Sequence, residues 1–153
     1  MKNFLLIVAI VFAGYVGLTQ YGGWLPNDQA GISKSNEATS GTGSDSVLAS
    51  AFENKTSNLQ VEGKGTVAKI LKDDTDGSRH QRFIIRLDSG QTLLVAHNID
   101  LAPRINALRE GDTLMFNGEY EWSAKGGVIH WTHHDPSGRH AAGWLKHDGQ
   151  TFQ

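Results

Sequence analysis

Histidine is the residue type that points most directly to chemistry in this chain. All of its seven histidines lie in the second half of the 153-residue sequence. Imidazole binds metal ions and transfers protons near neutral pH. The chain has no cysteine, so a metal site has to combine histidine with carboxylates. The positions are His80, His97, His130, His133, His134, His140 and His147.

Carboxylates meet histidines where two predicted strands form an antiparallel pair. Side-chain alternation over residues 113–122 and 128–133 gives each strand one polar face. A turn at residues 125–126 pairs Glu121 with His130, and a slip of two residues keeps the same faces together. The shared polar face holds Glu119, Glu121, His130 and His134. Carboxylates beside imidazoles suit a divalent-metal site or a general acid/base pair, although such pairs also occur as plain cross-strand surface contacts.

A second group of cationic side chains is predicted at the open end of a hairpin. If Ser89 and Gly90 form a two-residue turn, Arg82 lies opposite His97. The mouth of the hairpin then presents His80, Arg82 and His97, with Asp100 just beyond. Such a mouth grips an anion, or holds a metal ion through its imidazoles.

The first functional hypothesis is a metal-assisted hydrolase that acts on phosphodiesters or nucleic acid. Its divalent metal is held by ligands drawn from His97, His130, His134 and Asp135. Glu121 serves as the base beside His130, and Arg82 clamps the anion. Asp135 also opens a turn that contains proline and glycine, and His140 is expected only to be displayed beyond it.

The second hypothesis is a non-catalytic binder of single-stranded nucleic acid or a glycan. Its binding residues are Arg79, His80 and Trp131, supported by Tyr120, Trp122, Arg82 and Arg86. The same alternation places the aromatic side chains with the apolar set, which favours packing in a core. A formal net charge of -2 excludes binding through a broadly basic surface, so nucleic acid would need a local site. A third hypothesis is an assembly partner of another envelope complex.

These residues have to be positioned by a small, mostly β domain. Short segments typical of strands occur at residues 61–71, 79–87, 92–97, 113–122 and 128–133, with a short helix expected over 103–108. Five strands with a helix after the third give the order of an OB-like Greek-key barrel, and a small open sheet is the alternative. A short helix starting at Asp45 or Ser46 precedes the barrel, and Asp148-Gly149 predicts a final hairpin.

Three motifs in this domain resemble a known family. They are RHQRF at residues 79–83, VAHNID at 95–100 and GGVIHWTHHDP at 126–136. They resemble a family of small bacterial envelope proteins described only as a domain of unknown function, and the resemblance runs from about Leu48 to the C-terminus. It implies an envelope protein with an OB-like domain and implies no activity.

The N-terminal part of the chain predicts a place at a membrane. Residues 4–18 carry no charge and follow Lys2, and with the stretch up to Leu25 they reach the roughly 20 residues of a spanning helix. We expect an inner-membrane anchor over residues 1–25, or a cleaved signal peptide, with the rest of the chain in the periplasm. Residues 26–46 are predicted to form a flexible Ser/Gly/Thr-rich linker, and residues 47–153 are predicted to form the folded domain.

Overall fold

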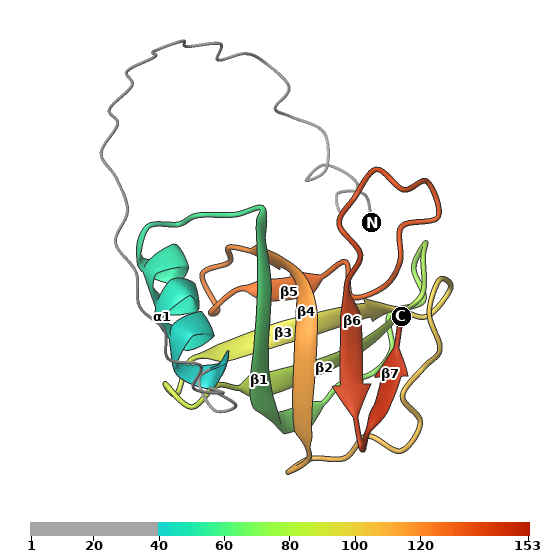
Figure 1. Ribbon diagram of the computed structural model, residues 1–153. Coiled ribbons are helices and arrows are strands. Elements are labelled where there is room, and N and C mark those ends of the chain that lie inside the picture. The colour runs from blue at the N-terminus through green and yellow to red at the C-terminus, as the bar shows by residue number, and fades with distance from the viewer. Residues whose placement is uncertain (1–39) are drawn as a thin grey trace, which may run out of the picture. The chain divides into compact units, whose positions relative to one another are not determined.

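The computed structural model describes residues 40–153, and within them the fold is mostly β with one helix (Figure 1). The elements are α1 (Ser40–Glu53), β1 (Leu59–Ile70), β2 (His80–Arg86), β3 (Thr92–Asn98), β4 (Thr113–Glu121), β5 (Val128–His130), β6 (Trp144–His147) and β7 (Gln150–Phe152). The five barrel strands and the last hairpin lie where the sequence predicts strands. The predicted membrane segment and residues 26–39 of the expected linker lie outside the described residues, and the last residues expected in the linker belong to α1.

The first five strands close into a barrel. Their order is β1-β2-β3-β5-β4, and β4 pairs back onto β1. All neighbours are antiparallel except β3 and β5, which are parallel. This closed five-stranded barrel is consistent with the expected OB-like domain. The β6–β7 hairpin is added at the edge of β4.

Strand β1 bends so that it can serve two neighbours. Its first part pairs with β4 and its last part with β2, and the register slips between Val67 and Lys69. Two glycines make the bend possible, because a Cβ at Gly63 would lie 2.8 Å from the Phe116 ring and one at Gly65 would lie 3.0 Å from the carbonyl of Arg86.

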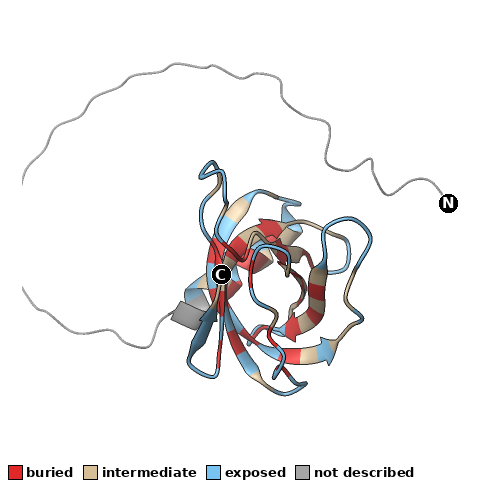
Figure 2. Cartoon of the chain, turned by 90° about the vertical axis from the view of Figure 1, so that its right-hand side faces the viewer, coloured by how far each residue is buried: buried red, intermediate tan, exposed pale blue. Residues whose placement is uncertain are grey.

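The core fills the barrel interior. Buried and more exposed residues alternate along the strands (Figure 2), as expected when one face of each strand turns inward. The largest fully buried apolar side chains are Tyr120, Phe83, Phe116, Leu48, Ile85, Leu93, Ile105, Leu114, Ile129 and Leu145. Tyr120 belongs to this core, which confirms the packing interpretation of that aromatic residue.

Helix α1 packs on the barrel through one apolar face. Leu48 and Ala51 are buried, and the Trp122 indole donates a hydrogen bond to the carbonyl of Phe52 at 3.1 Å. The side chain of Asp45 accepts the backbone N–H of Ser89 at 2.8 Å, so the helix also holds the β2–β3 turn. The helix begins at Ser40, earlier than the sequence predicts.

The prediction of a helix over residues 103–108 is wrong. This stretch forms turns, and its backbone is held by a buried side chain. The amide of Gln81 donates to the carbonyl of Ile105 and accepts its N–H, both at 2.9 Å. Those backbone groups therefore have partners on β2 instead of helical ones. In residues 40–153 no helix is long and apolar enough to cross a membrane.

Candidate functional site

The β4–β5 pair brings two carboxylates and an imidazole together on the outer wall of the barrel. Glu119 pairs with His130, and Glu121 pairs with Val128. This register is slipped by two residues from the predicted pairing of Glu121 with His130, and the slip keeps all three polar side chains on one face. The predicted polar face is confirmed for Glu119, Glu121 and His130.

These three residues form a compact cluster of candidate metal ligands. One ligand atom from each of Glu119, Glu121 and His130 lies within 4.8 Å of the others. His130 Nε2 is 3.3 Å from Glu119 Oε1, yet it is buried and has no aligned hydrogen-bond partner, the one such side-chain atom in the described part of the chain. Burial lowers the pKa of His130, and the two carboxylates only partly oppose that shift. A neutral Nε2 facing carboxylates could therefore bind a metal ion together with them.

His140 joins the same site, and the sequence interpretation missed it. Its Nε2 lies 2.6 Å from Glu119 Oε2, and its Nδ1 lies 2.8 Å from the carbonyl of Ala141. An ionised carboxylate and a carbonyl only accept, so both ring nitrogens donate and His140 is an imidazolium. Burial would lower the pKa of His140, but the hydrogen bonds to Glu119 and Ala141 outweigh it and raise the pKa. The ring stacks on Trp131 at 4.1 Å.

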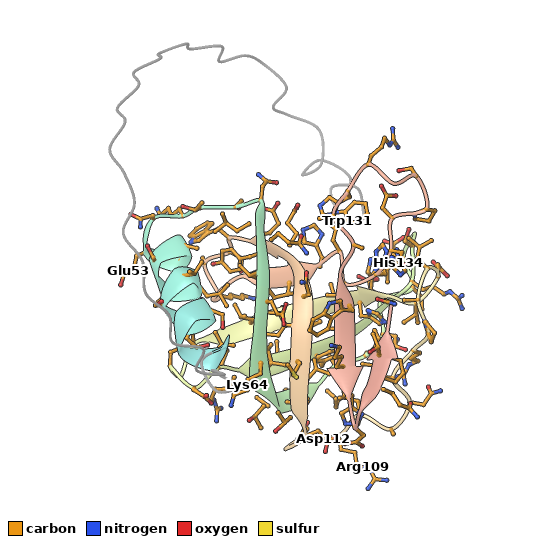
Figure 3. The ribbon with its side chains drawn as sticks, in the orientation of Figure 1. Glu53, Lys64, Arg109, Asp112, Trp131 and His134 are labelled. Atoms are coloured by element: carbon orange, nitrogen blue, oxygen red, sulfur yellow. The ribbon has the colours of Figure 1, made fainter. Side chains whose placement is uncertain are left out.

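The chain forms a loop over residues 131–143 because β6 occupies the part of the β4 edge along which β5 would otherwise continue. Strand β5 ends at His130, and Trp131 has a left-handed backbone with φ of 51°. Only Gly118 separates this last β5 pair on β4 from Asn117, which already pairs with Trp144 of β6, so β5 cannot continue. The chain leaves the sheet instead, as Figure 3 shows at Trp131 and His134.

The loop separates residues that an unbroken strand would have aligned. His134 is exposed and lies beyond the end of β5, so it does not join Glu119, Glu121 and His130 on the predicted shared face. His133 is buried, and its Nδ1 donates to the carbonyl of His134 at 2.7 Å. Trp131 stands beside His140 and outside the buried core.

Asp135 anchors this loop and is not among the clustered ligand atoms. Its carboxylate accepts the hydroxyl and N–H of Ser137 and the N–H groups of Arg139 and His140. These hydrogen bonds, that of the Ser137 hydroxyl foremost, hold the pKa of Asp135 well below its usual range. The predicted metal-ligand role of Asp135 is therefore replaced by a structural one.

The β2–β3 hairpin differs from the prediction by one residue. Gln81 pairs with His97, and Arg82 pairs with Ala96. The turn is longer than expected, because Leu87 bonds to Gln91 across three residues and Gly90 adopts a φ of +89°. A slip of one residue turns every side chain to the other face, so His97 points into the barrel and away from Arg82.

His97 is a buried core residue, which corrects its predicted role as a metal ligand. Its Nε2 lies 3.1 Å from the carbonyl of Pro103, a group that only accepts, so Nε2 carries the proton. Nδ1 then accepts the hydroxyl of Thr132 at 2.8 Å. Burial lowers the pKa of His97 to about 4, so both nitrogens are satisfied in the neutral form.

The basic side chains in and just before β2 form hydrogen bonds or ion pairs with groups close to them. Arg82 donates to the carbonyl of Lys72 at 3.1 Å, and its guanidinium lies 3.7 Å from Asp74. The side chain of Arg79 pairs with Asp100 at 2.6 Å. The imidazole of His80 lies 2.8 Å from the carbonyl of Ser78. The cations Arg79, His80 and Arg82 form no hydrogen bond or ion pair with Glu119, Glu121 or His130, so the two predicted groups of side chains are not joined by such contacts.

Comparison with known sequences adds the family. A family model described as "Protein of unknown function (DUF3465)" matches residues 31–153. No curated protein matches the chain.

Proposed function

Because this chain belongs to the DUF3465 family, whose description names no activity, we propose its function from the site: Glu119, Glu121 and His130 bind a divalent transition-metal ion. One observation carries this proposal. His130 Nε2 is buried, makes no well-aligned hydrogen bond although Glu119 Oε1 lies 3.3 Å away, and faces two carboxylates. A buried polar atom left unpaired is costly, and a cation between these groups would satisfy it while relieving the repulsion of Glu119 and Glu121.

The mix of ligands favours some ions over others. Imidazole nitrogen suits Zn²⁺ and similar transition metals, whereas Mg²⁺ and Ca²⁺ prefer sites made of oxygen alone. The contact between Glu119 and His140 supports the ligand with an outer hydrogen bond, as is usual around metal-bound carboxylates. We therefore propose Zn²⁺ or Mn²⁺ as the ion.

The proposed activity is hydrolysis of phosphodiesters. An ion held by three protein ligands keeps an open position, where bound water becomes a nucleophile near neutral pH. Glu119 and Glu121 would repel a phosphodiester unless a cation neutralised them, so a phosphodiester would bind here only when the metal ion is present. Glu121 is thereby proposed as a ligand in place of the base expected from the sequence, and His130 keeps the ligand role that was one of its two expected roles. Arg82 is not available as the anion clamp.

The non-catalytic binder has less support. Its expected stacking residues are already engaged, because Tyr120 is buried, Trp122 donates to Phe52, and Trp131 stacks on His140. Arg79 and Arg82 are paired with Asp100 and Asp74. A glycan or single-stranded nucleic acid would thus find few free aromatic faces among the residues named for it.

Metal analysis of His130→Ala tests the proposal. We expect the wild-type protein to bind about one Zn²⁺ or Mn²⁺ ion, and His130→Ala to bind at least about 10-fold more weakly because a direct ligand is lost. Equilibrium dialysis with elemental analysis measures the affinity. His134→Ala is the matched control, since His134 is an exposed histidine of the adjoining loop and should bind as wild type. Equal affinities in wild type and His130→Ala would reject the site.

The activity is tested on the same preparations. Wild type with Zn²⁺ or Mn²⁺ should hydrolyse a chromogenic phosphodiester or single- or double-stranded DNA or RNA, and His130→Ala should not. Metal binding without hydrolysis would support the proposed metal site and refute the proposed hydrolase activity. Oligonucleotide or glycan binding that is unchanged in His130→Ala would favour the binder.

We also propose that the domain stands on the periplasmic side of the inner membrane. The apolar, uncharged run over residues 4–18 after Lys2 supports an anchor of this orientation. Phosphodiesters or other substrates would then be those of the cell envelope.

A further inference from the structure

We infer that Asp135 is a positioning residue of the proposed metal site, which it does not touch: it folds the 131–143 loop so that His140 holds Glu119 in its ligand orientation. This inference rests on the proposed function for its effect on metal affinity. Its structural half concerns only the contacts of Asp135 and His140. The two halves can therefore be measured separately.

The first link runs from Asp135 to His140. Both oxygens of the Asp135 carboxylate are used, since Oδ1 accepts the N–H of Ser137 at 2.9 Å and Oδ2 accepts the N–H groups of Arg139 at 2.8 Å and His140 at 3.0 Å. Three backbone N–H groups aimed at one carboxylate wrap the chain around it. Gly138, with φ of +64°, supplies the left-handed turn that this path requires.

The second link runs from His140 to Glu119. The loop brings the His140 imidazole back to the sheet, where it is held on three sides. Its contacts are Glu119 Oε2 at 2.6 Å, the carbonyl of Ala141 at 2.8 Å, and the stacked ring of Trp131. Once Oε2 is held, the other oxygen of Glu119 is the one that lies 3.3 Å from His130 Nε2. Fixing a ligand's rotamer before the ion arrives lowers the entropic cost of binding.

This arrangement accounts for the burial of Glu119. Its side chain is only 15% exposed although it lies on the outer wall of the barrel, because the loop covers it. The covering depends on Asp135, since its carboxylate holds the backbone N–H of His140, whereas the Gly138 turn, the bond from Arg139 to Ser137 and the bond from the Gly143 N–H to the His133 carbonyl hold other parts of the loop. Without Asp135, the backbone of His140 loses its hydrogen bond within the loop, and its ring contacts with Glu119, Ala141 and Trp131 have to position it unaided.

The structural half is tested by NMR on the metal-free, full-length protein in detergent. In the wild type, the carbon-bound ring protons of His140 should shift upfield, because the ring stacks on Trp131 at 4.1 Å with an angle of 8°. Asp135→Ala should lose this shift. Arg139→Ala is the matched control, since it keeps the backbone N–H that Asp135 binds and should keep the shift. An unchanged shift in Asp135→Ala would overturn the inference.

The functional half is tested with Zn²⁺ alone, in competition with a chromophoric chelator. Asp135→Ala and His140→Ala should each raise the Kd about 10-fold or more, in the range typical of residues that support metal ligands. The double variant should bind Zn²⁺ no more weakly than His140→Ala does, because Asp135 acts through His140. Additive losses would show that Asp135 acts by another route and would overturn the inference. Wild-type protein that binds no Zn²⁺ or Mn²⁺ would refute the proposed function, and the NMR result would still decide the link between Asp135 and His140.

Discussion

Glu119 is contacted by two imidazoles that differ in charge. His130 comes from the neighbouring strand, and burial lowers its pKa, so it faces Glu119 as a neutral ring. His140 comes from the loop and has donors on both nitrogens, so it balances the charge of Glu119. One carboxylate thereby presents one oxygen to a cation that the protein supplies and the other to the proposed metal position.

His97 gives a pH dependence to folding. Its pKa of about 4 in the folded protein lies below the ordinary 6.5, so the unfolded chain takes up a proton first as the pH falls. The stability that the neutral, buried ring provides is complete above pH 6.5 and is lost between pH 6.5 and 4. The shift corresponds to about 3 kcal/mol across this window.

We predict that His97→Gln is less stable than the wild type at pH 7 but loses less stability between pH 6.5 and 4. Urea unfolding at several pH values measures the difference between the two proteins. His80→Gln, on the outer side of β2, is the control and should keep the wild-type slope. The prediction fails if His97→Gln and wild type lose stability in parallel. The lowered pKa of His130 acts in the same direction in both proteins and cancels in the comparison.

Individual residues were predictable where alternation alone decides their face. Glu119, Glu121 and Tyr120 are such residues, because β4 is a regular strand. His97 was not, since its face depends on whether the turn after Leu87 has two residues or three. His140 was not, because it reaches Glu119 through hydrogen bonds of Asp135 that no periodicity encodes.

At the scale of elements, the outer site depends on how β5 and β6 share the edge of β4. Strand β5 covers positions 119–121 and β6 covers positions 115–117. The chain between them has to leave the sheet at Trp131 and return at Gly143. Gly143 is the tightest point of the return, because a Cβ there would lie 1.9 Å from the carbonyl of Trp131 and 2.6 Å from that of Asn117.

We predict that Gly143→Ala destabilises the fold by about 3 kcal/mol, because the added methyl group meets two backbone carbonyls that cannot move independently. The free energy of unfolding in urea measures this. Gly43→Ala is the matched control: a Cβ at Gly43 meets nothing within 4 Å, and alanine in a helix should stabilise by roughly 0.5–1 kcal/mol. Similar effects of the two substitutions would contradict this account of Gly143.

Elements were predictable from the sequence when their own residues determine them. All five barrel strands and the Asp148-Gly149 hairpin are of this kind. The helix expected over 103–108 is absent because Gln81, distant in sequence, binds the backbone of Ile105. The extension of β5 beyond His130 is absent because β6 competes for β4. Both errors come from tertiary partners, which a local pattern does not contain.

At the scale of the whole molecule, the proposed periplasmic location makes a prediction about residues 4–18. Alkaline phosphatase fused to the C-terminus should be active in cells, because that enzyme requires an oxidising compartment for its disulfides. Deletion of residues 4–18 should abolish the activity. Deletion of residues 27–38, in the expected linker, is the control and should preserve it. An active fusion that lacks residues 4–18 would refute the proposed anchor.

The pairing of β1 with β4 also sets the order in which the protein can fold. Leu59 pairs with Tyr120, and Trp122 bonds to Phe52, so barrel closure joins segments that lie far apart in the chain. Structures dominated by such distant contacts have high contact order and fold slowly, in milliseconds to seconds. The barrel cannot close until β4 is available. A chain that is exported as proposed would therefore remain open during passage across the membrane, and the proposed metal site, built on β4 and β5, would form only after arrival.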